Sequence, residues 1–356
     1  MFANRAYQKG GEPAHHDPTN EMKHADCRIE RILFAAAILA SEEEHIDRLN
    51  VRCELIRSAG LQKKRQLQLG WCLPGGRSAA ANIAFVTYGT PAPQDPLDAD
   101  AIAAALRAAH APVSLAVVAT CGSTNAELLV RAAAGAPSGT ALACETQTAG
   151  RGRRGRAWIA PTGGSLAFSL LWRMPRAGAA LAGLSLAAGV ACIRALEHCG
   201  VHGVALKWPN DIVHGGSKLG GILVEAVPGA DGSAIVCGVG VNTRLSGDAR
   251  EAIGQPSTDV ATLAAAPPSR TALLAALLVE LAAAMERFAA DGFAAFRDAW
   301  LARHAYQGET VRVVLADERC VDGRAVGLAE DGALLVEHAG RIERFHSGDV
   351  SLRPAA

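Results

Sequence analysis

The sequence predicts an α+β protein in which a central mixed β-sheet with flanking helices is followed by a small C-terminal β-barrel. Between residues 97 and 306, helical stretches are interspersed with strand-like runs and hairpins, which is typical of this fold class. Half of the 356 residues are hydrophobic, which is sufficient for a packed core. Residues 308–354 differ, because short alternating runs are separated by Asp-Gly and Gly-Asp turns, as in a small barrel.

The elements of the central zone follow from apolar periodicity and from turn residues. In chain order we expect a helix over 98–110, a strand over 113–119, a helix over 123–134, strands over 141–145 and 165–172, a helix over 177–198, strands over 204–207, 219–225 and 234–241, and helices over 271–288 and 293–304. Ser123 is well placed to cap its helix, because its hydroxyl can accept a backbone N–H. The Gly-rich stretch 228–232 joins two of the strands as a hairpin.

Residues 1–95 form a separate zone, which we interpret as an N-terminal extension that is poorly ordered or of uncertain fold. Charge clusters alternate there with Gly and Pro breaks, and residues 28–56 have helical character without a clean amphipathic stripe. We therefore divide the chain into this extension (1–95), a central domain (96–306) and the small β-barrel domain (307–356).

Charge and cysteine usage argue against several classes of protein. The 35 basic and 35 acidic residues give a formal net charge of zero, which argues against a dedicated nucleic-acid binder. The nine cysteines show no C-x-x-C pair and no zinc spacing, which favours buried thiols in a reducing compartment. The apolar stretch 177–196 is rich in Ala and Gly and contains Arg194, which indicates a buried helix rather than a membrane span.

Residues 150–156 read Gly-Arg-Gly-Arg-Arg-Gly-Arg and follow a strand-like run. Arginine keeps its charge at physiological pH, and its planar fork suits phosphate and carboxylate oxygens. Interleaved glycine lets the backbone approach a ligand and present its N–H groups. The loop therefore predicts an ordered anion site, and a polyphosphate is the ligand that fits it best.

This loop also fits two other interpretations, a dinucleotide-binding motif and an RNA-binding loop. The glycines satisfy the GxGxxG spacing of dinucleotide-binding folds, but turn formers follow instead of a helix, and residues 170–174 contain no carboxylate for a ribose. An exposed basic loop that holds RNA is the second alternative. The position between two strand-like apolar segments favours the ordered anion site over it.

Further segments carry patterns that suit a ligand site. Residues 121–125 place small polar side chains at a strand-to-helix junction, where they can bind a urea or carboxamide. Lys207 ends a strand beside a Trp and a Pro, so that its ammonium can reach a carboxylate and an α-phosphate. Residues 215–225 form a glycine-rich turn and strand, and residues 238–242 place glycines inside a strand, which indicates close approach of a ligand or backbone.

In order and spacing, these segments resemble the motifs of biotin–protein ligases: residues 123–125, Gln147 with 150–156, and the runs 207–211, 218–225 and 238–242. The resemblance covers roughly residues 97–353, including the C-terminal domain. It implies a class II synthetase-like fold of the biotin–lipoate ligase type, with residues 96–306 as the catalytic biotin- and ATP-binding domain. It also implies a two-step reaction, in which biotin and MgATP form biotinyl-5′-adenylate and the biotin then passes to a lysine of a carrier domain.

The resemblance implies a role for each matching residue. Catalysis falls to Lys207, Arg151 and Arg153. Biotin would contact Ser123, Thr124, Asn125, Gln147, Arg151, Gly152, Arg153 and Lys207. We expect the nucleotide to contact Gly150, Arg153, Arg154, Gly155, Arg156, Trp158, Asn210 and Asn242. Positive charge is needed where two anions meet, and the carboxylate of biotin itself is the nucleophile. No metal is assigned to protein ligands, because Mg²⁺ arrives with ATP.

The implied acceptor is the biotin carboxyl carrier protein of acetyl-CoA carboxylase, and the expected location is the cytoplasm. No nucleic acid and no membrane are expected as partners, and a homodimer is left open. Residues 1–95 do not match the winged helix-turn-helix of relatives that repress biotin operons, which favours a monofunctional ligase over a bifunctional ligase and repressor. A lipoate or octanoate ligase is the other alternative. The Arg-Gly loop (residues 150–156) and the run 207–211 argue against it.

Overall fold

The computed structural model describes residues 49–57, 63–73, 77–86, 95–229, 232–315, 319–346 and 351–354. The chain divides between Gly89 and Thr90 into two units. In the first unit, three antiparallel strands form a sheet in the order β1 (Leu49–Arg57), β2 (Lys63–Leu73) and β3 (Arg77–Val86). Strand β1 corrects the helical character expected at the end of the range 28–56, while residues 28–48 lie outside the described part of the chain.

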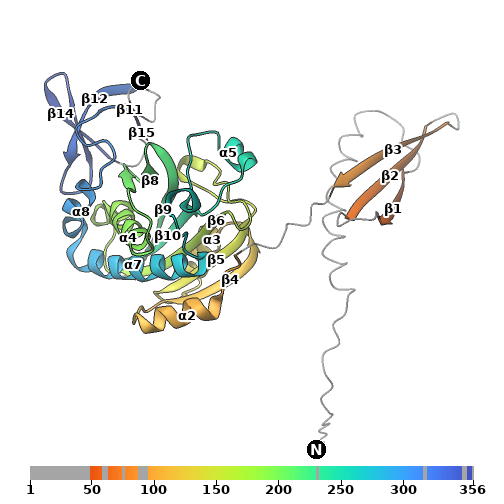
Figure 1. The fold of residues 1–356 in the computed structure, drawn as a ribbon, viewed down its shortest axis with the longest axis horizontal. Coiled ribbons are helices and arrows are strands. Elements are labelled where there is room, and N and C mark those ends of the chain that lie inside the picture. The colour runs from red at the N-terminus through yellow and green to blue at the C-terminus, as the bar shows by residue number, and fades with distance from the viewer. Residues whose placement is uncertain are drawn as a thin grey trace, which may run out of the picture. The chain divides into compact units, whose positions relative to one another are not determined.

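A seven-stranded mixed sheet is the centre of the second unit (Figure 1). Its spatial order is β4 (Ser114–Cys121), β5 (Thr140–Gln147), β6 (Ser165–Met174), β10 (Gly232–Asn242), β9 (Ser217–Gly229), β8 (Asp211–His214) and β7 (Ala205–Lys207). Only β4 and β5 pair in parallel among these strands, because helix α3 (Thr124–Ala133) connects them. Strand β8 was not predicted, because only two apolar residues, Ile212 and Val213, lie between Asp211 and His214.

Helices cover both faces of this sheet. The long helices α4 (Leu184–His198) and α7 (Arg270–Asp291) pack on one face with α2 (Ala99–Ala108), where Val190, Leu277 and Phe168 belong to the main apolar core. Helix α3 covers the other face, where Leu128 packs with Leu171 in a smaller core. The stretch Gly178–His198, which includes α4, is long and apolar enough to cross a membrane, but 61% of its apolar 18-residue window is buried inside the protein. It contains the buried helix that the sequence predicts over 177–198, but α4 begins only at Leu184, because Gly183 adopts φ +80° and separates it from the 3₁₀ turn Gly178–Leu181.

Shorter elements lie in the connections between these strands and helices. They are the 3₁₀ turns η1 (Arg153–Gly155), η2 (Gly178–Leu181) and η3 (Phe293–Ala295), and the helices α5 (Gly247–Ile253), α6 (Val260–Leu263) and α8 (Arg297–Leu301). The range 293–304, expected as one helix, is divided into η3 and α8. Gly292 precedes this pair at φ +68° and ends α7, so that the chain turns sharply there.

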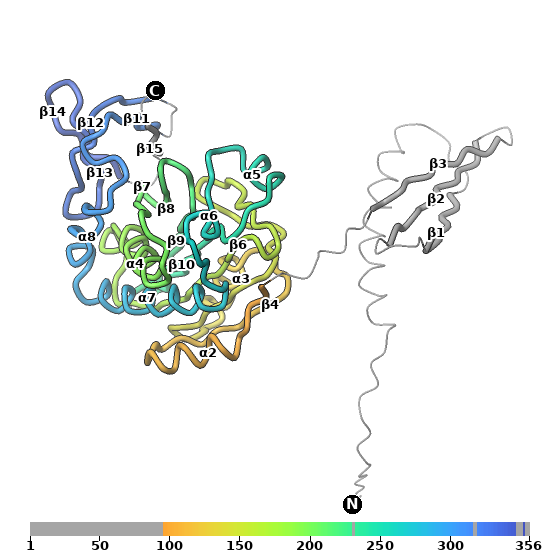
Figure 2. The backbone as a smooth tube through the Cα atoms, viewed as in Figure 1, coloured from red at the N-terminus to blue at the C-terminus, as the bar shows by residue number. Residues whose placement is uncertain are grey.

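The last five strands form an antiparallel sheet (Figure 2). Its order is β14 (Arg341–Phe345), β13 (Leu334–His338), β12 (Cys320–Leu328), β11 (Thr310–Val314) and β15 (Ser351–Pro354). The small antiparallel domain is thereby confirmed, while its closure into a barrel stays a prediction. Trp208 is buried, and its Nε1 donates to the Gly332 carbonyl at 3.1 Å, so this sheet is tied to the end of β7.

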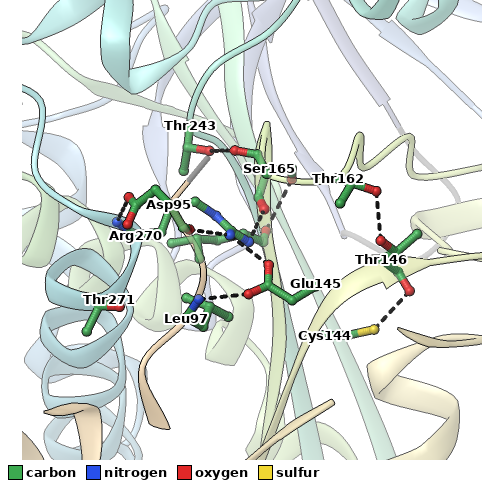
Figure 3. A network of polar contacts seen from close by, with 12 residues as sticks. Asp95, Leu97, Cys144, Glu145, Thr146, Thr162, Ser165, Thr243, Arg270 and Thr271 are labelled. Carbon is green, nitrogen blue, oxygen red and sulfur yellow. Dashed lines mark hydrogen bonds and ion pairs between the residues drawn. The ribbon is translucent and has the colours of Figure 1, made fainter. Parts of the chain in front are cut away.

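A buried ion pair holds the start of the second unit against the sheet (Figure 3). Arg270, at the start of α7, lies 2.7 Å from the carboxylate of Glu145 on β5, and its side chain is 3% exposed. The guanidinium also donates to the carbonyls of Asp95 and Ser165, and Glu145 accepts the Leu97 N–H at 2.7 Å. Three elements and the incoming chain therefore meet at one arginine. The domain boundaries predicted at 95/96 and 306/307 stay predictions.

Candidate active site

The α3 face of the central sheet opens into a cavity where the side chains become small. Alternate residues of a strand point to the same face. On this face, Leu171 of β6 and Val236 of β10 pack under α3. The next residues of the same alternation are Ser169 on β6, and Gly238 and Gly240 on β10. The strands thus change from apolar packing to open space, and the cavity lies over this part of the sheet.

The cavity has about 150 Å³ of free volume and gathers nearly all the residues predicted for the site. The predicted residues that line it are Ser123, Thr124, Asn125, Gln147, Arg151, Gly152, Arg153, Arg154, Arg156, Trp158, Lys207, Asn210 and Asn242. Gly150 and Gly155 stand outside this set. Arg151, Arg153 and Lys207, which come from two distant parts of the sequence, therefore share one cavity. The roles of all these residues remain predictions.

The first turn of helix α3 forms one end of the cavity. Ser123 occupies the N-cap position, but its hydroxyl makes no capping bond, which corrects the expectation that it caps the helix. Gln147 supplies the cap instead, because its Oε1 accepts the Thr124 N–H at 2.8 Å. Ser123, Thr124 and Asn125 are all buried at the cavity. The arrangement leaves the Ser123 hydroxyl available to a ligand.

Glycines bring the backbone against these polar groups. A Cβ at Gly238 would lie 2.0 Å from Asn125 Oδ1, and one at Gly240 would lie 2.3 Å from the Trp158 ring. A Cβ at Gly150 would lie 2.7 Å from the Trp158 carbonyl oxygen. Gly150 therefore supports the loop from behind, which explains why it does not line the cavity.

The Arg-Gly loop is a small hairpin that closes on itself. The Trp158 N–H donates to the Gly150 carbonyl at 2.9 Å, and the Gly152 N–H donates to the Arg156 carbonyl at 2.8 Å. At the tip, Arg154 adopts φ +58° and Gly155 φ +70°. These left-handed conformations turn the chain so that the arginines on both sides reach the cavity.

A second group of polar residues faces the loop from β7, β8 and β9. Arg153 donates to Asn210 Oδ1 at 3.3 Å, and Asn210 is held in turn by the Ile222 carbonyl at 2.8 Å. Lys218 Nζ lies 2.7 Å from Asp211 Oδ1 and 5.7 Å from the centre of the Trp158 ring. Asp211 is the one carboxylate among the described residues that line the cavity, whereas six of them are Arg or Lys. The cavity is accordingly built for an anionic ligand.

Two buried polar atoms at the cavity lack a partner among the described residues: Asn242 Oδ1 and Trp158 Nε1. Asn242 is 2% exposed, and its Nδ2 donates to the carbonyls of Lys218 and Thr258. Its oxygen is therefore an acceptor that has been taken out of water without compensation. Such a group is costly unless a ligand donates to it.

Sequence reasoning missed several residues of this site. Asp211 and Lys218 belong to the runs 207–211 and 218–225, but their pairing depends on β8, which was not predicted. Ser169 sits in an apolar strand and gave no signal beyond its position in the alternation. Ile253, Gln255 and Ser257 also line the cavity, from α5 and the segment after it. That segment is polar but has no charged side chain between residues 253 and 257, so only the folded chain could identify it as part of the site.

The Cys121 thiol next to Ser123 is unsuited to nucleophilic chemistry. Burial, together with contact with Cys144, raises the pKa of Cys121 to about 12. The thiol therefore stays protonated at neutral pH, in agreement with the absence of a nucleophile from the expected mechanism. Within the described residues, no cluster of three His, Cys, Asp or Glu side chains could hold a metal ion.

Comparison with known proteins places this chain and its fold among ligases of the biotin and lipoate type. The model of the biotin/lipoate A/B protein ligase family matches residues 122–242, and that of the biotin protein ligase C-terminal domain matches residues 306–353. The bifunctional ligase/repressor BirA of Salmonella typhimurium is 35% identical over 269 residues, which cover 75% of this chain and 82% of that protein. The chain belongs to the biotin protein ligase family, which confirms the resemblance seen in the sequence.

Two further relatives extend the comparison. The biotin–acetyl-CoA-carboxylase ligase of Mycobacterium tuberculosis is 37% identical over 248 residues, covering 66% of this chain and 88% of that protein. The solved structure of the biotin protein ligase from Aquifex aeolicus in complex with biotin and ATP matches with a TM-score of 0.60 at 30% identity. It covers 68% of this chain and 99% of its own. The predicted fold class is confirmed by this match.

Proposed function

We propose that the protein activates biotin with ATP to biotinyl-5′-AMP and transfers the biotin to a lysine of a biotin carboxyl carrier domain. The observation that carries this proposal is the single cavity that brings Arg151, Arg153 and Lys207 beside the polar first turn of α3. The polar first turn of α3 can bind a neutral head group, and the three cations can surround a charged reaction centre. The names of the relatives from Mycobacterium tuberculosis and Aquifex aeolicus support the same activity.

The first step needs positive charge at one point. A carboxylate oxygen of biotin attacks the α-phosphorus of ATP, so that an O–P bond forms while the bond to pyrophosphate breaks. Both reactants are anions, and their repulsion is offset by fixed cations that need not reorganise. Lys207 would lie between the carboxylate and the α-phosphate, and Arg151 and Arg153 would cover both from the loop. The residues supply position and charge, and the substrate itself supplies the nucleophile.

The nucleotide is assigned to the end of the cavity near Trp158 and Asn242. An exocyclic amine of a purine would satisfy the buried acceptor Asn242 Oδ1. The ring of Trp158, which Gly240 approaches closely, offers a flat apolar surface beside it. Mg²⁺ enters with the triphosphate as part of the substrate. Asp211 is the one described lining carboxylate that could contact it, and it would have to leave Lys218 to do so.

In the second step, the ε-amine of the acceptor lysine attacks the acyl carbon of the adenylate. AMP leaves, and the amine loses a proton as the amide forms. We assign the acceptor to the biotin carboxyl carrier protein of acetyl-CoA carboxylase, and the location to the cytoplasm. Five cysteines of the second unit are free thiols, which supports a reducing compartment: Cys121, Cys144, Cys192, Cys199 and Cys237. No nucleic-acid partner is assigned, since the formal net charge is zero, and the proposal is independent of homodimer formation.

The test is incubation of the purified protein with biotin, MgATP and an apo carrier domain, followed by intact-mass measurement of the carrier. The carrier is expected to gain the mass of one biotinyl group in an ATP-dependent manner. Lipoate in place of biotin should give no modification. A carrier that stays unmodified with biotin, or that is modified as well with lipoate, would overturn the proposal.

The variant Lys207→Gln tests the role of the ammonium in the first step. We expect the rate of pyrophosphate release to fall by roughly two orders of magnitude, the typical cost of losing one group that stabilises transition-state charge. Arg107→Gln, an exposed arginine on α2, is the matched control and should retain the full rate. Equal rates for the wild type and Lys207→Gln would remove Lys207 from the mechanism.

A further inference from the structure

A chain of hydrogen bonds runs from strand β9 to the inner end of the cavity. Asn125 donates through Nδ2 to the Leu223 carbonyl at 3.1 Å and to Glu225 Oε2 at 2.8 Å. Its Oδ1 lies 2.5 Å from Ser169 Oγ, which lies in turn 2.7 Å from Thr124 Oγ1. Thr124 lines the cavity, whereas Glu225 stands behind it, half-buried on β9. A carboxylate outside the cavity is thus connected to a hydroxyl inside it.

The direction of each bond follows from what each group can donate. The Leu223 carbonyl and the Glu225 carboxylate only accept, so the Asn125 amide must turn Nδ2 toward β9 and Oδ1 toward Ser169. A flipped amide would place Oδ1 against two acceptors. Ser169 carries a single hydroxyl proton, and Asn125 Oδ1, the nearer acceptor, takes it.

The consequence reaches Thr124. Ser169 Oγ can donate its one proton either to Asn125 Oδ1 at 2.5 Å or to Thr124 Oγ1 at 2.7 Å. With the proton on the shorter bond to Asn125, the contact between the two hydroxyls is a hydrogen bond only when Thr124 donates to Ser169. The competing acceptor, Gln147 Oε1, is farther from Thr124 Oγ1, at 3.2 Å, and already accepts the Thr124 N–H. Thr124 Oγ1 is therefore left with lone pairs for a ligand, beside the acceptor Oε1 of Gln147.

We propose that Glu225 is a positioning residue. It fixes which way Asn125, Ser169 and Thr124 donate their hydrogen bonds, so that the inner end of the cavity accepts hydrogen bonds from the N–H groups of a cyclic urea. The inference rests on the proposed function, because it states what the biotin end of that site recognises. Gly238 supports it, since the missing Cβ gives the Asn125 oxygen the room for this orientation. Without the carboxylate, Asn125 can flip, the two hydroxyls can turn, and Thr124 can donate into the cavity instead.

The experiment compares Glu225→Leu, which removes the acceptor, with Glu225→Gln, which keeps one oxygen in its place. Ser169→Ala interrupts the same chain at its middle and serves as a second variant if Glu225→Leu does not fold. Glu197→Leu is the matched control, because it also removes a partly exposed carboxylate from an ion pair, with Arg303 at 3.0 Å, but remote from the cavity. The probes are biotin and the two biotins methylated on a single ureido nitrogen, each titrated by calorimetry.

In the wild type, we expect N-methylation to weaken binding. Glu225→Leu and Ser169→Ala should raise the Kd for biotin about tenfold, as expected for loss of one buried hydrogen bond, and should reduce the discrimination against the methylated ligands. Glu225→Gln should restore both to within about threefold, and KM for ATP should be unchanged throughout. Glu197→Leu should lower only the melting temperature.

The outcomes separate the inference from the proposed function. If Glu225→Leu and Ser169→Ala retain the affinity and discrimination of the wild type, the polarity argument is wrong while biotin ligation stands. If KM for ATP rises together with the Kd for biotin, the carboxylate acts through general stability, and the inference is equally overturned. A wild type that fails to bind biotin would instead count against the proposed function.

Discussion

Individual glycines decide how closely the backbone of β10 approaches the side chains that line the cavity. At Gly238 and Gly240, no side chain can be accommodated without moving Asn125 or Trp158. The sequence showed that these glycines weaken a strand and must have a compensating purpose. The folded chain shows the reason, because Asn125 and Trp158 lie against these two glycines.

The variant Gly238→Ala tests this close approach. The added methyl group would displace the Asn125 amide, and we expect the Kd for biotin to rise about tenfold, which corresponds to the lower part of the cost of overpacking. Gly247→Ala is the control, because a Cβ there meets no atom within 4 Å. The measurement is calorimetric titration with biotin. Unchanged affinity in Gly238→Ala would mean that Asn125 has room elsewhere.

The buried side chain of His304 is expected to contribute to the pH dependence of the stability of the second unit. His304 is 8% exposed, its Nε2 has no partner among the described residues, and its backbone bridges to Leu206 beside Lys207. Burial lowers its pKa below 6.5, against the opposing contact with Gln307. The neutral form is therefore favoured in the folded state.

The sign of the effect follows from the lowered pKa. The stabilising contribution is fully present above the unfolded-state pKa of about 6.5 and is lost as the pH falls through the lower folded-state pKa. We expect the free energy of unfolding, measured in urea between pH 7.5 and about 5, to decrease more steeply in the wild type than in His304→Gln. Parallel curves for the two proteins would show that His304 titrates normally.

At the scale of elements, the arms of the Arg-Gly hairpin are joined by the two backbone hydrogen bonds that flank Arg151 and Ala157, and the Arg156 N–H donates to the Arg153 carbonyl at 3.3 Å near the tip. Its tip residues, Arg154 and Gly155, are exposed. Because the loop buries little surface of its own, we expect it to open easily and to gain order when it closes over a ligand.

Limited proteolysis with trypsin should detect this closure. We expect cleavage within residues 148–157 to slow in the presence of biotin and ATP, because the arginines that trypsin recognises would be engaged with ligand charge. Cleavage after the exposed Arg107 of α2 provides the internal reference and should not change. Equal cleavage of the loop with and without ligands would contradict closure.

Most elements of the second unit could be predicted because their patterns were strong. The buried helix α4 and the strands β6 and β10 have continuous apolar runs with clear ends. Strand β8 and the helices α5 and α6 were not predicted, because these short elements leave no alternating or helical period in the sequence. Strand β7 is shorter still, but it ends the apolar run that begins at residue 204 and was predicted. The site was predictable wherever motif residues carry the chemistry, and unpredictable at Ser169 and Glu225, whose importance comes from their neighbours.

At the scale of the whole molecule, Arg270 joins the start of the second unit, strand β5 and helix α7 (Figure 3). Its loss would leave the Glu145 carboxylate without its cation in a largely buried position. We expect Arg270→Leu to reduce the free energy of unfolding by about 3–5 kcal/mol in urea denaturation. Arg287→Leu, on the same helix but half exposed, should cost less than about 1 kcal/mol. Similar losses for both variants would show that the network contributes little.

The bond from the Trp208 indole to the Gly332 carbonyl connects the C-terminal strands to the residue that follows Lys207. Because Trp208 is held in this way, the position of the Lys207 side chain depends on the C-terminal strands. Damage to the last fifty residues, by heat or by substitution in a turn that touches no reactant, would accordingly appear first as slower chemistry and only later as unfolding.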